Sequence, residues 1–149
     1  MEQFDILDKN GCPIGATADK GMPLDNGQYY LGTHAYIFNS KNEFLLQQRA
    51  LDKDFLPGGW DIHMGRVTAG ETSKEGIIRE IKEEIGLTFP AHKIRFVGRV
   101  IREIYHHIID LYFLQIDFEL DKLNLQKKEV IGVKSVCAGE MLALVSSMD

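Results

Sequence analysis

A helix signal between Thr72 and Gly86 constrains this chain more than any other feature of its sequence. Thr72 and Glu75 have the spacing of a capping box, in which each side chain accepts from the backbone amide of the other residue. Apolar side chains then recur in a stripe about 100° wide, which is typical of a core-facing surface; these are Ile77, Ile78, Ile81 and Ile85. Gly86 suits a left-handed C-cap. The pattern predicts a helix that packs one face on a core.

Acidic side chains occupy a different sector of this helix. Glu80, Glu83 and Glu84 lie at i, i+3 and i+4, so their carboxylates stack on neighbouring turns. Like charges at this spacing cost a few tenths of a kcal/mol each, which one bound divalent cation would offset. Gly76 lies in the same sector, and we interpret it as room for a metal and phosphate oxygens to approach the helix. A Glu-rich helix commonly presents only a solvated face, so the flanking residues decide between a metal site and a solvated surface.

The flanking residues complete a longer motif between Gly65 and Leu87. Its spacing is G-x5-E-x7-R-E-U-x-E-E-x-G-U, where U is apolar, and nine positions carry it: Gly65, Glu71, Arg79, Glu80, Ile81, Glu83, Glu84, Gly86 and Leu87. The stretch resembles the Nudix box at every specified position. At average residue frequencies such a match arises by chance about once in a billion starting positions. We therefore prefer the functional interpretation of the acids.

The resemblance implies an α/β fold, a Nudix-type α/β/α sandwich with a mixed sheet. It also implies hydrolysis of a diphosphate linkage in a nucleoside diphosphate derivative or related compound, with Mg²⁺ or Mn²⁺ as the cofactor. Glu80, Glu83 and Glu84 would then bind the metal, Glu71 and the Gly65 loop would support the same site, and Arg79 would hold a carboxylate in place. The general base stays open among Glu83, Glu80 and, on a later loop, Glu129.

Substrate contacts are less constrained by the sequence than the metal site. Arg49 at the end of a predicted strand, and Lys53 and Arg66 in flanking loops, are candidates for phosphate contacts, because an acidic protein needs local cations to hold an anion. Each could equally be a surface cation. The box reads only the diphosphate, so the rest of the small-molecule substrate stays open.

A rival enzyme class shares part of this pattern. The first half of the chain resembles the Nudix branch that includes isopentenyl diphosphate isomerase, in which a Cys-Gly-His segment supplies a catalytic thiol and a metal ligand. Here the segment is Met64-Gly65-Arg66, and Ile108 and Asp110 stand where the isomerase carries paired glutamates. A thioether cannot act as acid or base, and arginine cannot bind a cation. A third alternative is a ligand-sensing module without turnover, which the intact box disfavours.

The remaining sequence predicts one domain over residues 1–149. Strands are predicted at 4–7, 29–38, 44–49, 94–104, 108–118 and 130–136, with loops at 19–27 and 51–59, a hairpin joining 29–38 to 44–49, and a closing helix at 139–145. The net charge of −5, without a Lys/Arg run, argues against broad nucleic-acid binding. Two distant cysteines, no leader and no long apolar run predict a cytoplasmic protein without a membrane span. The family resemblance also allows a homodimer through the N-terminal strand.

Overall fold

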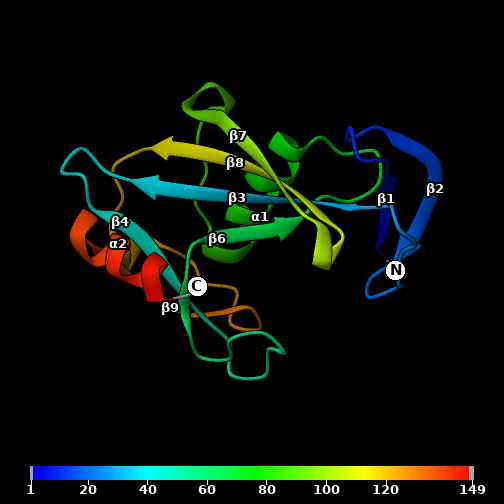
Figure 1. The fold of residues 1–149 in the computed structure, drawn as a ribbon. Helices are drawn as coiled ribbons and strands as arrows, with labels where there is room; N and C mark the ends of the chain where they lie inside the picture. The colour runs from blue at the N-terminus through cyan, green and yellow to red at the C-terminus, as the bar shows by residue number, and fades with distance from the viewer. Residues whose placement is uncertain (1, 148–149) are drawn as a thin grey trace.

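A mixed β-sheet lies between two helices and forms a three-layer α/β/α sandwich in the computed structural model, which describes residues 2–147 (Figure 1). The strands are β1 (Gln3–Leu7), β2 (Pro13–Asp19), β3 (Tyr30–Phe38), β4 (Phe44–Arg49), β5 (Trp60–Asp61), β6 (His63–Arg66), β7 (Ile94–Arg102), β8 (His107–Gln115) and β9 (Val130–Val136). The helices are α1 (Ser73–Ile85) and α2 (Ala138–Ser147), and short 3₁₀ turns cover Ala91–Lys93, Glu103–Tyr105 and Leu120–Lys122.

The main sheet has the order β5-β4-β3-β8-β7, with β6 added to β3 and β9 added to β4. Its central pair, β3 and β8, is parallel, and the other pairings are antiparallel. β1 and β2 form a separate two-stranded sheet beyond the end of β3 (Figure 1). The predicted α/β class with a mixed sheet is confirmed.

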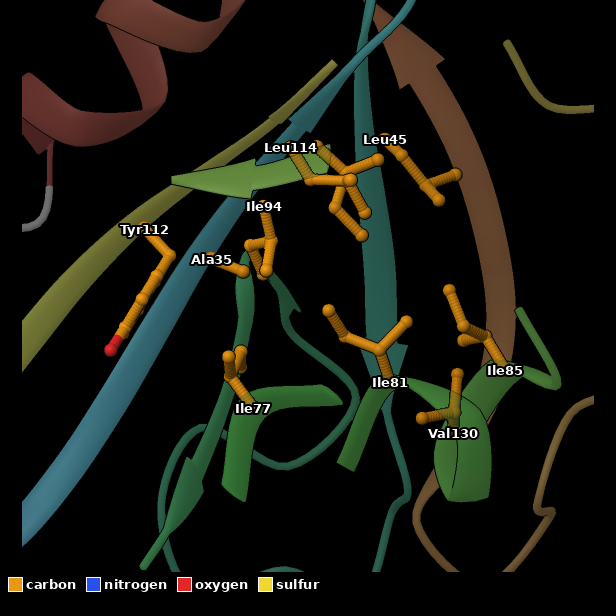
Figure 2. Packing of buried hydrophobic residues seen from close by; sticks show 10 residues of the cluster. Ala35, Leu45, Ile77, Ile81, Ile85, Ile94, Tyr112, Leu114 and Val130 are labelled. Atoms are coloured by element: carbon orange, nitrogen blue, oxygen red, sulfur yellow. The ribbon is translucent and has the colours of Figure 1, made fainter. Parts of the chain in front are cut away.

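Helix α1 forms where the capping residues predict it. Thr72 accepts from the Glu75 amide at 3.1 Å, and Glu75 accepts from the Thr72 amide at 3.0 Å. Gly86 closes the helix in the left-handed region at φ 70°. The apolar stripe meets the sheet, as Figure 2 shows, because Ile77, Ile81 and Ile85 are buried against side chains of β3, β8 and β9. This packing fixes the rotation of α1 and leaves Glu80 and Glu83 outside the apolar cluster, whereas Glu84 stays buried beside the sheet.

Helix α2 covers only part of the opposite face. Met141 and Leu144 pack against Leu46 of β4 and Val136 of β9, together with partly buried neighbours that include Tyr36. In Figure 1 this helix lies beside β4 and β9, whereas α1 lies behind the sheet. The sheet face around β6 and the β7–β8 connection is therefore not covered by α2.

The predicted hairpin between β3 and β4 is correct only at its turn. Phe38 pairs with Phe44, but residues 32–35 of β3 pair with β6, so β4 diverges and pairs with β9 instead. β2 was not predicted, since most of its residues are exposed and show no alternation. β5 and β6 are too short to give a period-2 pattern. The predicted bounds of β4 and β9 are confirmed.

No helix in the described part of the chain is long and apolar enough to cross a membrane. Cys12 and Cys137 are both exposed and free.

Candidate active site

Arg79 lies at the centre of the acidic sector of α1. Its Nε and Nη2 donate to the two carboxylate oxygens of Glu71 at 2.8 and 3.0 Å, and its Nη1 contacts Glu80 at 2.9 Å and Glu83 at 3.3 Å. Nη2 also donates to the Arg66 carbonyl at 3.3 Å. One guanidinium thus brings together three of the predicted acids and the strand that precedes the helix, as expected for an arginine that positions carboxylates.

Glu71 is held rigidly before the helix begins. Besides Arg79, it accepts from the Thr68 amide at 3.1 Å and the Thr68 hydroxyl at 3.0 Å. The hydrogen bond from Arg79, followed by those from Thr68, lowers the pKa of the Glu71 carboxyl. Glu71 is therefore ionised at neutral pH, and it neutralises Arg79 rather than extending freely into solvent.

Two glycines allow α1 to lie close to the chain segment before it. A Cβ built on Gly65 would lie 2.4 Å from Cγ of Glu80, so a side chain there displaces this glutamate. A Cβ on Gly76 would lie 3.1 Å from Oε1 of Glu71 and 3.3 Å from Cγ2 of Val67. The interpretation of Gly76 as space for a metal was wrong: Gly76 is buried and permits packing of the helix on the 67–71 loop.

Gly65→Ala tests how closely Glu80 must be placed. We expect turnover to fall about tenfold or more, because small misplacements at a catalytic centre are costly, while the fold is kept since Glu80 is flexible. The matched control is Gly98→Ala, where an added Cβ meets no atom within 4 Å. Turnover and thermal unfolding of both variants are measured. Equal turnover in the two variants contradicts a role for the placement of Glu80.

Glu84 is the most buried acid of the sector. Its Oε2 accepts from Nε2 of Gln47 at 3.0 Å, and the residue is only 8% exposed. Burial raises the pKa of Glu84 to about 8, and the neighbouring Glu80 and Glu129 add to the rise. Burial also raises the pKa of Glu80, against the opposing effect of Arg79. Without a cation, the protein therefore favours the protonated, neutral form of Glu84 at neutral pH, because it compensates a second negative charge beside Glu80 incompletely.

The raised pKa of Glu84 predicts how stability depends on pH without metal. The unfolded chain loses this proton near pH 4.5, as an ordinary glutamate does, and the folded chain loses it only at about pH 8. Unfolding releases a proton between these values, so the free energy of unfolding falls as pH rises through that window. Millimolar Mg²⁺ should reverse the loss at about pH 8 and have less effect at about pH 5.5. Unfolding in urea measures this; Glu84→Gln should remove the window, and an unchanged pH profile in that variant contradicts the assignment.

The site offers further oxygen atoms to a cation. Oε1 of Gln47 and Oδ2 of Asp61 are buried without a hydrogen-bond partner, and the two residues face each other in the β4–β5 pairing. Within residues 2–147, no three His, Cys, Asp or Glu side chains are already grouped to hold a metal, since Arg79 engages Glu71, Glu80 and Glu83. The carboxylate and amide oxygens nevertheless suit a hard cation. Sequence reasoning missed Gln47 and Asp61; polar residues inside strand segments were the available signal.

The other predicted site residues are divided between the sheet face that carries α1 and the opposite face. Lys53 is ion-paired with Glu129, and Glu129 is close enough to Glu84 to raise its pKa. Arg49 donates its Nε to the Phe55 carbonyl at 2.7 Å. Gly65, the residue before Arg66 in β6, faces α1. Successive residues of a strand point to opposite faces, so the Arg66 side chain points away from α1. Lys53 and Glu129 therefore belong near the helix, and the Arg66 side chain does not.

Ile108 and Asp110, which stand where the isomerase carries paired glutamates, do not form a pair of acids. Asp110 is buried and makes a two-bond ion pair with Arg99, at 2.6 and 3.0 Å. Ile108 is fully buried in an apolar cluster, and Met64 stands in β6. These side chains give neither a thiol nor a free carboxylate for protonating an alkene.

A mixed α/β/α sandwich with a loop–helix–loop of this composition is the architecture of Nudix hydrolases. The family model described as NUDIX domain matches residues 29–147, and the chain belongs to this family. An uncharacterized Nudix hydrolase of Listeria monocytogenes is 36% identical over 151 residues, which covers 99% of this chain and 86% of the relative. The homologues and the domain together identify the protein as a hydrolase.

Two further comparisons bear on the alternatives. An isopentenyl-diphosphate Delta-isomerase of Saccharopolyspora erythraea is 35% identical, but only over 89 residues, which is 59% of this chain and 46% of that enzyme. The crystal structure of DR0079 from Deinococcus radiodurans matches with a TM-score of 0.80 and 19% identity, over 98% of this chain and 90% of that protein. The isomerase likeness is thus partial, whereas the fold is shared along nearly the whole chain.

Proposed function

We propose that this protein hydrolyses the diphosphate linkage of a nucleoside diphosphate derivative or a related organic diphosphate, with Mg²⁺ or Mn²⁺ held by Glu80, Glu83 and Glu84. The observation that carries the proposal is the Arg79-centred carboxylate cluster on one face of α1. A divalent cation bound there would offset the diphosphate charge and lower the pKa of a bound water.

Other residues of the site position the carboxylates and accept a proton. Arg79 and Glu71 form a paired support that fixes the rotamers of Glu80 and Glu83. Gln47 orients the Glu84 carboxylate from β4. Glu83 is the most exposed of the carboxylates bonded to Arg79, with 51% of its side chain accessible, and it makes the longest contact to that arginine. We therefore assign Glu83 as the group that accepts the proton of the attacking water.

Cations on the flanking loop would meet the substrate. Lys53 extends toward the site and is held there by Glu129, which makes it the best placed phosphate contact of the three candidates. Arg49 ends β4 just before this loop, and its guanidinium lies 5.6 Å from the centroid of the Phe55 ring. An anionic substrate that binds Lys53 would displace it from Glu129. The freed Glu129 carboxylate would then add negative charge near the metal site without acting as the base.

A product screen tests the proposal. Nucleoside diphosphate conjugates, dinucleotides and prenyl diphosphates are offered with Mg²⁺, with Mn²⁺ or with EDTA, and products are identified by mass spectrometry. We expect cleavage products that contain phosphate, formed only with a divalent cation. Dimethylallyl diphosphate formed from isopentenyl diphosphate would establish the isomerase alternative, and binding without turnover of any compound would establish a sensing module; either overturns the proposal.

A further inference from the structure

Four basic side chains gather on the sheet face opposite α1. Arg66 of β6, His34 of β3, His107 of β8 and Arg102 of β7 occupy neighbouring positions, which we call the cation cluster. Arg102 pairs with His107, His107 pairs with Tyr30, and Arg66 pairs with Gly32, two residues before His34. In each of these strands the neighbouring residues face α1, so the four side chains share the sheet face opposite α1.

The cation cluster has no acidic partner among the described residues. Within residues 2–147, none of the ion pairs involves Arg66, Arg102, His34 or His107. The nearest acid along the chain, Glu103, accepts a 2.6 Å hydrogen bond from the Tyr29 hydroxyl instead. Nη1 of Arg66 is buried and lacks a hydrogen-bond partner. Buried guanidinium donors are normally satisfied, so this one indicates a missing acceptor.

Aromatic rings hold the two arginines in place without neutralising them. The guanidinium of Arg66 lies 5.0 Å from the Tyr30 ring centroid and 5.6 Å from that of Phe4. That of Arg102 lies 5.2 Å from the Tyr105 ring. Stacking of this kind keeps the charge and leaves the edge of the guanidinium free to donate. The arginines are therefore positioned for a ligand that accepts hydrogen bonds.

The two histidines are affected by the same surplus of positive charge. Burial, together with the charges of Arg102 and His107, lowers the pKa of His34 to about 4. Burial, then Arg66 and Arg102, also lower the pKa of His107. At neutral pH the imidazoles are uncharged and can donate to a ligand, while the arginines supply its counter-charge.

Gly32 leaves room between these side chains. It lies beside Arg66 in the register, and a Cβ built on it has no atom closer than 3.6 Å. No side chain therefore separates the members of the cluster at this position, although a methyl group would fit there without a backbone clash.

We propose that the cation cluster binds a phosphate-type oxyanion, with Arg66 and Arg102 as its charged contacts. A tetrahedral dianion matches two guanidinium groups and two neutral imidazoles better than a carboxylate does, since it offers more acceptor oxygens. The site is separate from the carboxylate cluster on α1. The Arg66 backbone lies between the two sites, because its carbonyl accepts a hydrogen bond from Arg79.

The test uses inorganic phosphate as the probe, with EDTA present so that no metal-bound phosphate forms. The full chain is titrated at constant ionic strength, and the imidazole ¹H–¹⁵N signals of His34 and His107 are followed. We expect saturable shifts in the wild type, and an apparent Kd about tenfold higher in Arg102→Gln, because a charge-assisted hydrogen bond is removed. Arg95→Gln, which removes the same charge elsewhere on β7, is the control.

Absence of saturable shifts, or equal weakening in Arg102→Gln and Arg95→Gln, would overturn the proposal. Because binding is measured without metal, failure here is separate from failure of the proposed hydrolysis. Kinetics then identify the source of the oxyanion. A raised KM with unchanged kcat in Arg102→Gln shows that it belongs to the hydrolysed substrate, and unchanged kinetics with lost phosphate binding shows a separate ligand.

Discussion

Glu83→Gln is expected to lower turnover at least about 100-fold while leaving the fold intact, since charge stabilisation at a metal centre supplies several kcal/mol. The substitution keeps the shape of the side chain and removes the charge. Glu83 is half exposed and makes a single 3.3 Å contact with Arg79, so the loss of its charge should scarcely change stability. The measurement is kcat at saturating Mg²⁺, together with the thermal unfolding midpoint.

The control for Glu83→Gln is Glu119→Gln, which makes the same change at an exposed residue outside the site. Near wild-type kcat is expected for this control. If Glu83→Gln keeps wild-type turnover with a native fold, the carboxylate cluster is not the catalytic site as we have assigned it.

Arg79→Met is expected to lower the free energy of unfolding in EDTA by about 2 kcal/mol, because it leaves partly buried carboxylates without their counter-charge. Glu71 loses two hydrogen bonds, and Glu80 and Glu83 lose one each. Mg²⁺ should restore part of this stability by replacing the positive charge. Turnover should fall as well, since the carboxylates lose their common support. Urea unfolding with EDTA and with Mg²⁺ measures the effect.

Arg95→Met, an exposed arginine of β7, serves as the control for Arg79→Met. It should change stability by less than about 0.5 kcal/mol, as is usual for surface substitutions. Equal destabilisation by the two variants, or a loss in Arg79→Met that does not respond to Mg²⁺, would show that Arg79 does not act by organising the acids.

The parts of the fold that the sequence predicts correctly are those with strong local signals. Helix α1 carries its own start and stop in Thr72 and Gly86, and its apolar stripe determines which face is buried. β2, β5 and β6 lack such signals, because they are short or exposed and depend on pairing with distant segments. The divergence of β4 from β3 likewise follows from competition with β6, which no local pattern reveals.

The candidate site shows the same division. The motif spacing predicted that Glu71, Arg79, Glu80 and Glu83 lie close together, and ion pairs to Arg79 join them in the structure. Their roles in metal binding and catalysis stay a prediction. Gln47 and Asp61 reach the site from other strands, and Gly76 proved to be a packing glycine. The opposite orientation of Arg66 depends on the register of β6 against β3. These are tertiary properties, and they decide which cations meet the carboxylates.

The most direct test of the central claim is the fate of solvent oxygen during turnover. A cleaved diphosphate substrate is incubated with Mg²⁺ in ¹⁸O water, and the products of the wild type and of Glu83→Gln are compared by mass spectrometry. We predict one labelled oxygen in a phosphate-containing product of the wild type, with the labelled product reduced at least about 100-fold in the variant. Label that is absent from the phosphate products, or formed equally by the variant, would contradict water attack on a diphosphate at the α1 carboxylates.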